Sequence, residues 1–166
     1  MKMKILNKSQ RLAILFLASF CFVFAKCKKE DSLPSYYFRC KVNGADYRPN
    51  GCANCTQCDL LGDTTLIIGG NRDTESLGIG INDSSYLKTG SYFLKNVIGR
   101  RADYKNGTLT NDRYFTDANY TGLLVISKLD KSTKVIEGTF YFKAYNAFRG
   151  DSISVTEGKF RLKYTI

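Results

Sequence analysis

Alternation of apolar and polar residues with a period of two runs from residue 36 to the end of this chain, and it constrains the fold more than any other feature. It is clearest near the C-terminus, where one parity holds Ile136, Gly138, Phe140, Phe142 and Ala144 and the other holds Thr139, Tyr141, Lys143 and Tyr145. Successive side chains of a β-strand point to opposite faces, whereas a helix repeats apolar positions every three to four residues. The pattern predicts antiparallel β-structure and no helix after the N-terminal segment.

Turn residues between the alternating runs divide the chain into about eight to ten expected strands. They are expected at residues 36–42, 45–48, 66–68, 76–81, 90–94, 102–104, 113–115, 123–129 and 134–145, with a last strand after a hairpin loop at 146–151. The segment that holds Cys52, Cys55 and Cys58 is expected to be a loop. Many strands joined by short loops indicate a single-domain antiparallel β-sandwich or a partly closed barrel.

Two short motifs predict local backbone geometry. Asn43-Gly44 suits a two-residue hairpin turn, which requires positive φ angles at both positions. In the last strand, the inward parity of Ile153 and Val155 is opposite to that of Phe160 and Leu162. One residue must therefore be inserted between the two halves, and Glu157-Gly158 is the expected β-bulge.

The N-terminus has the composition of an export signal. Four basic residues, Lys2, Lys4, Lys8 and Arg11, precede a mostly apolar run of 14 residues from Leu12 to Ala25, and Cys27 follows almost at once. We expect residues 1–26 to be a lipoprotein signal peptide, Cys27 to carry the lipid, residues 27–35 to form a tether and residues 36–166 to form the folded domain. An ordinary cleaved secretory signal or a short uncleaved anchor is the alternative, since Lys26 replaces the small residue usual before a lipidated cysteine.

The expected location follows from this anchor. Cys27 is followed by Lys28, Lys29, Glu30 and Asp31, a run that resembles the signal directing Bacteroidota lipoproteins to the outer face of the outer membrane. A solvated polar linker is the simpler interpretation of the same run. We expect an outer-membrane lipoprotein that meets the membrane through its lipid.

Charge and composition exclude some classes of function. The formal net charge is +10, but residues 1–26 hold five of the 25 basic residues and no acidic one, which leaves +5 on the mature chain. A nucleic-acid partner is therefore not expected. The chain contains no histidine, so the commonest general base and neutral metal ligand are missing. We expect no enzyme activity and no cofactor.

Cys40, Cys52, Cys55 and Cys58 are the sharpest feature of the domain. In an exported protein, four cysteines most simply form two disulfides, and we expect one bridge from the loop to Cys40 and one within the loop. A zinc site of four thiolates, an iron-sulfur cluster and a thioredoxin-like redox pair are the alternatives. The spacing fits zinc and iron-sulfur sites imperfectly, so no metal site is assigned, and no βαβ pattern surrounds the motif to support a thioredoxin-like pair.

The last two strands offer a candidate binding surface. Basic residues and tyrosines of outward parity occur on both strands and comprise Tyr141, Lys143, Tyr145, Lys159, Arg161 and Lys163. Such a face could hold an acidic glycan or a phosphate-bearing polysaccharide through charge-assisted hydrogen bonds and ring contacts. A solvated face whose lysines block edge-to-edge pairing is the plainer interpretation. Glu137 and Glu157 could also meet as an acid pair for glycoside hydrolysis, although both fit turn or bulge positions.

The closing segments 134–146 and 153–160 and the entry Phe38-Arg-Cys-Lys-Val-Asn-Gly44 resemble a family of small Bacteroidota lipoproteins whose domain has no known function. The resemblance implies an exported all-β lipoprotein and carries over no catalytic residue. We therefore expect a lipid-anchored, non-catalytic binding or interaction module of the cell envelope, with a glycan or protein partner. A metal or redox site at the cysteines and a purely structural envelope protein are the alternatives.

Overall fold

The computed structural model describes residues 35–50, 54–96 and 99–166. All described residues belong to one compact unit, residues 34–166. The expected signal peptide, the lipidated Cys27 and nearly all of the tether lie outside the described residues. Within the described ranges no helix is long and apolar enough to cross a membrane.

The predicted all-β fold is confirmed. The described residues form eleven strands and one short 3-10 turn at Thr110–Asp112, and they contain no α-helix. The strands are β1 (Tyr37–Val42), β2 (Ala45–Tyr47), β3 (Thr56–Leu61), β4 (Thr65–Arg72), β5 (Glu75–Asn82), β6 (Gly90–Leu94), β7 (Arg100–Asn106), β8 (Arg113–Phe115), β9 (Gly122–Asp130), β10 (Val135–Asn146) and β11 (Asp151–Lys163).

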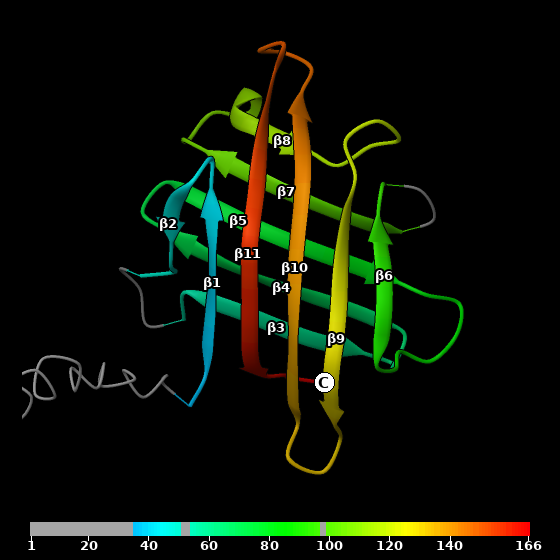
Figure 1. Ribbon diagram of the computed structural model, residues 1–166. Coiled ribbons are helices and arrows are strands. Elements are labelled where there is room, and N and C mark those ends of the chain that lie inside the picture. Colours follow the sequence, from blue (N-terminus) through cyan, green and yellow to red (C-terminus); the bar gives the residue numbers. More distant parts are fainter. Residues whose placement is uncertain (1–34, 51–53, 97–98) are drawn as a thin grey trace, which may run out of the picture. The chain divides into compact units, whose positions relative to one another are not determined.

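All pairings between these strands are antiparallel, and the strands form one curled sheet with two layers. In Figure 1, β1, β11, β10, β9 and β6 run side by side in a front layer, and β3, β4, β5, β7 and β8 cross behind them. The layers join where Tyr145 of β10 pairs with Phe115 of β8. A parallel bridge from Asp59 to Thr165 joins β3 to the end of the chain. The result is the expected partly closed barrel.

The core lies between the two layers and is built from the inward parity of each strand. On β10, Phe140 packs against Phe38 of β1, with ring centroids 5.1 Å apart, and against Phe160 of β11 at 6.4 Å. Gly138 lies in the same inward row, where a Cβ atom would come within 2.7 Å of the Phe160 ring. The glycine therefore lets this ring lie directly on the β10 backbone.

Both predicted backbone motifs are present. Asn43 and Gly44 have φ angles of 49° and 84° and join β1 to β2. Glu157 has a φ of 54°, and the register between β10 and β11 shifts between Phe140 and Phe142, opposite this residue. The bulge keeps Val155 and Phe160 on the same inner face although they are five positions apart in the sequence.

One strand was not expected. β3 occupies residues that the cysteine-rich composition indicated as loop, and Cys58 and Leu60 point inward from it. Buried cysteine behaves as a small apolar residue, so the alternation was present but was attributed to disulfide or metal chemistry. Most other strands extend one to four residues beyond the expected limits.

Candidate functional site

The candidate surface lies on the outer face of the front layer. Strands β10 and β11 pair along their length, which sets Lys159 opposite Thr139, Arg161 opposite Glu137 and Lys143 opposite Ser154. All six predicted surface residues are exposed or half-buried. Lys163 lies opposite Val135, ten residues along β10 from Tyr145, a distance of about 33 Å at strand rise. The surface is therefore a long strip and not one compact cluster.

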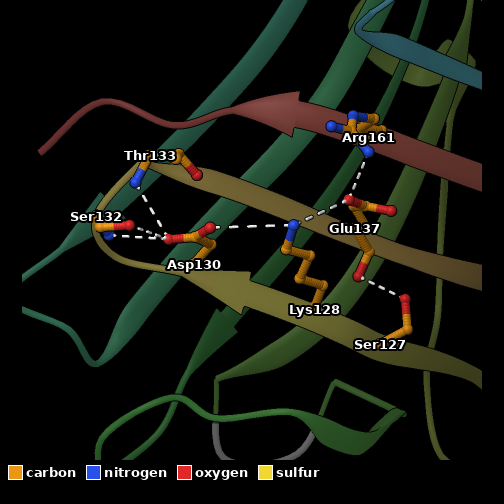
Figure 2. A network of polar contacts seen from close by, with 7 residues as sticks. All are labelled: Ser127, Lys128, Asp130, Ser132, Thr133, Glu137 and Arg161. Atoms are coloured by element: carbon orange, nitrogen blue, oxygen red, sulfur yellow. Dashed lines mark hydrogen bonds and ion pairs between the residues drawn. The ribbon is translucent and has the colours of Figure 1, made fainter.

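Arg161 is the most strongly paired of these cations. Its guanidinium lies 2.7 Å from the Glu137 carboxylate, which also lies 3.8 Å from Lys128 (Figure 2). Lys128 in turn lies 3.9 Å from Asp130, which accepts hydrogen bonds from Ser132 and Thr133 in the β9–β10 turn. Arg161 thus belongs to a balanced network of charges, and its positive charge is largely offset.

The tyrosines of the strip differ in their availability. Tyr145 is half-buried and stacks on Tyr120, with ring centroids 4.9 Å apart. Tyr141 is 55% exposed and lies in register with Leu123 of β9, which is in register with the 64%-exposed Phe93 of β6. An apolar row therefore crosses three strands on the outer face.

Further cations lie on β1, on the side of β11 away from β10, and they were not among the residues predicted for the site. Strand β1 pairs with β11, which sets Arg39 directly opposite Lys159 and Lys41 opposite Thr156. Arg48 follows the end of β2, in which Tyr47 pairs with Cys40. The pairing of the first strand with the last thus extends the basic strip sideways.

These residues enclose a hollow of about 340 Å³ at the β2–β1–β11 edge of the front layer. Its lining comprises Arg39, Cys40, Lys41, Asp46, Arg48, Glu157 and Lys159. Four cations and two carboxylates give this lining a net charge of +2 at neutral pH. Lys163 lies elsewhere, in a hollow formed with the end of the chain.

Lys41 and Glu157 form an ion pair within this lining. The Lys41 ammonium donates to the Glu157 carboxylate at 2.8 Å, and this hydrogen bond raises the pKa of the lysine. The β-bulge places Glu157 there, because its inserted residue turns the side chain outward toward β1. The bulge predicted from parity therefore shapes the site.

The hydrogen bond of Tyr47 ties this edge to the back layer. Its buried hydroxyl donates to the Gly70 carbonyl of β4 at 2.6 Å, and the Arg72 guanidinium lies 4.8 Å from the centre of its ring. Arg72 also donates to the Asp46 carbonyl at 2.7 Å. The short β2 strand is thereby fixed although it lies at the edge of the sheet.

The residues missed by sequence reasoning are Arg39, Lys41, Asp46 and Arg48. Arg39 and Lys41 do alternate with the buried Phe38, Cys40 and Val42, so their outward direction could be read from the sequence. Their proximity to Lys159 could not, because it depends on a pairing between residues more than 100 positions apart.

The cysteines do not form the expected framework. Cys40 and Cys58 are buried free thiols within the core, whereas Cys55 is disulfide-bonded and Cys52 lies outside the described residues. The expected bridge from the loop to Cys40 is therefore absent. Burial raises the pKa of both Cys40 and Cys58 to about 12, which suppresses the thiolate needed for metal binding or redox attack.

The described residues give little support to a metal site or to a pair of carboxylates for glycoside hydrolysis. In residues 35–50, 54–96 and 99–166, no three histidine, cysteine or acidic side chains group as a metal site. Glu157 lies opposite the Phe140–Phe142 step, about four residues or 13 Å along β10 from Glu137. Paired carboxylates for glycoside hydrolysis lie about 5–9.5 Å apart, and here each carboxylate has its own cation.

Comparison with known families places the domain. Residues 37–162 match the family described as Domain of unknown function (DUF6252). The chain belongs to this family. The matched residues span all of β1 to β10 and nearly all of β11, so the DUF6252 domain is the whole β-domain. No curated protein and no solved structure matches the chain.

Proposed function

We propose that this protein is a lipid-anchored, non-catalytic module of the cell envelope that binds an acidic glycan on the outer face of its front layer. The anchor rests on the export signal and Cys27, which give an outer-membrane lipoprotein of the Bacteroidota type. The DUF6252 domain has no known function, and the chain contains no histidine to serve as a general base.

One observation carries the binding proposal, namely the cations on the outward faces of β1 and β11. Lysines on a sheet are often explained as protection against edge-to-edge pairing. That explanation does not apply to Lys159, since β11 pairs with β1 on one side and with β10 on the other. Strand β2 covers β1 only at Cys40–Val42, so Arg39 precedes the covered part, but it lies directly opposite Lys159. These two opposed cations on the outer face require another reason.

The apolar row of Phe93, Leu123 and Tyr141 begins beside the bulge that borders these cations. Aromatic faces pack against the C–H surfaces of sugar rings, while cations hold acidic substituents. A polymer with both features fits this face better than a simple ion does. A protein partner is the alternative occupant and is separated by the test.

The anchor and the binding are tested separately. Metabolic labelling with palmitate should mark the wild type and leave Cys27→Ala unlabelled, and labelling of the variant would contradict the anchor. For binding, the full chain in detergent is titrated with polygalacturonate, a phosphorylated dextran and unmodified dextran. We expect binding to the acidic polymers only, whereas equal binding to neutral dextran, or none to any polymer, would contradict the proposal.

A further inference from the structure

Three cations occupy neighbouring positions across the sheet at the hollow. Arg39 of β1 lies directly opposite Lys159 of β11. On the other side of β1, Cys40 pairs with Tyr47, the last residue of β2, and Arg48 follows Tyr47 directly. All three residues line the same hollow. A single transverse row therefore holds three positive charges.

This row violates a rule of sheet stability. Like charges directly opposite one another in a sheet are destabilising. Within the described part of the chain, no carboxylate forms an ion pair with Arg39, Arg48 or Lys159. Arg39 instead lies over the Tyr37 ring, 5.6 Å from its centre. The carboxylates of Asp46 and Glu157 in the same lining leave a net charge of +2, and like charges opposed at a hollow are typical of a binding site, where a ligand relieves the repulsion.

The side chains of Arg39, Arg48 and Lys159 favour an oxyanion as the ligand. The planar guanidinium of arginine donates two parallel hydrogen bonds to a carboxylate or a phosphate, and lysine adds a mobile point charge. With about 340 Å³, the hollow is at the lower end of the range for small-molecule sites and exceeds the needs of a bare ion.

The other residues that line the hollow indicate to what kind of molecule the anionic group is attached. Asp46 and Glu157 place carboxylate oxygens, which accept hydrogen bonds and repel a second anion, at the border of the same hollow. Hydroxyl groups are the natural donors to them. Resting on the function proposed above, we infer that this hollow binds one carboxylate- or phosphate-bearing sugar unit, with Arg39, Arg48 and Lys159 around the anion and Asp46 and Glu157 accepting from its hydroxyls.

Lys41 has a separate role in this arrangement. Its charge is neutralised by Glu157 at 2.8 Å, so it adds little attraction while the pair is intact. Replacing Glu157 by glutamine releases this fourth cation and keeps a hydroxyl acceptor. Glu157→Gln should therefore bind the anionic sugar more tightly than the wild type does.

The test uses the full chain in detergent with glucuronate, glucose 6-phosphate, inorganic phosphate and glucose, measured by calorimetric titration. Arg39→Gln and Lys159→Gln should each weaken both anionic sugars about fivefold to tenfold, the usual loss of one charge-assisted contact. Lys88→Gln and Arg101→Gln remove the same charges from exposed positions outside the hollow and should leave affinity unchanged. Circular dichroism verifies that each variant is folded.

Each of the following outcomes would refute one part of the proposal. Phosphate that binds as tightly as glucose 6-phosphate would refute the sugar unit, and equal losses in the control variants would refute a local site. Acidic polymers that bind while Arg39→Gln has no effect would refute the hollow but leave the proposed function intact. Anionic sugars that bind in the hollow while no polymer binds would refute the proposed function and retain the site.

Discussion

Replacement of Gly138 by alanine tests most sharply how closely β9, β10 and β11 pack within the front layer. A Cβ at this position would lie 2.1 Å from the carbonyl oxygen of Val125 and 2.7 Å from Cζ of Phe160. An ordinary carbon–oxygen contact is about 3.3 Å or longer, so the carbonyl would have to move by more than about 1 Å. That carbonyl belongs to β9, which is paired on both sides.

The expected cost is large because neither neighbour can yield easily. Overpacking of a filled core typically costs about 1–3 kcal/mol, and a fixed backbone neighbour places Gly138→Ala at the upper end, about 3 kcal/mol. For a domain of this size, the loss lowers the melting temperature by roughly 10 °C.

Gly80 provides the matched control, since it also lies within a strand and a Cβ there would meet nothing within 4 Å. Gly80→Ala should be neutral or stabilise the fold by about 0.5 kcal/mol, because alanine restricts the unfolded chain. Urea unfolding followed by far-ultraviolet circular dichroism measures both variants. Equal stability of the two variants would refute the close approach of β9 and the Phe160 ring to β10.

Three further predictions concern single groups. Tyr47→Phe removes the donor to the buried Gly70 carbonyl and should cost about 1 kcal/mol or more in urea unfolding, and an unchanged midpoint would contradict the link between the layers. Hydrogen bonds from the turn after β9 lower the pKa of Asp130 below its ordinary value of 3.8, so its contribution to stability is complete above pH 3.8 and declines as the pH falls below it. The stability gap between the wild type and Asp130→Asn should therefore narrow as the pH falls from 5 to 2, and a gap of the same size at both pH values would refute this linkage. Cys40 and Cys58 should resist iodoacetamide at pH 8 in the native protein and react after unfolding, because burial raises the pKa of each thiol to about 12. Rapid alkylation of either thiol in the native state would contradict its burial.

Local features of the fold could be predicted where all the residues that determine the feature lie within one strand or turn. The parity change between Val155 and Phe160 located the Glu157 bulge, and Asn43-Gly44 located a hairpin turn. The β3 strand was missed because Cys58, a core residue, carried an expectation of disulfide or metal chemistry.

The candidate site was predicted only in part, for a different physical reason. Lys159 and Arg161 were identified, but the sequence could not show that Glu137 offsets the charge of Arg161 or that Arg39 lies opposite Lys159. Both facts depend on strand register, which is set by core packing and by the bulge together. Charge balance across neighbouring strands becomes visible only once that register is known.

The salt dependence of polygalacturonate binding tests the central claim most directly. Cations on an exposed strip attract a polyanion through interactions that added salt screens, with a Debye length of about 10 Å at 0.1 M and 3 Å at 1 M. We expect binding at low salt that weakens steadily as sodium chloride rises, with a smaller salt dependence in Arg39→Gln and Lys159→Gln. Binding that is absent at low salt, or that does not change with salt, would contradict it.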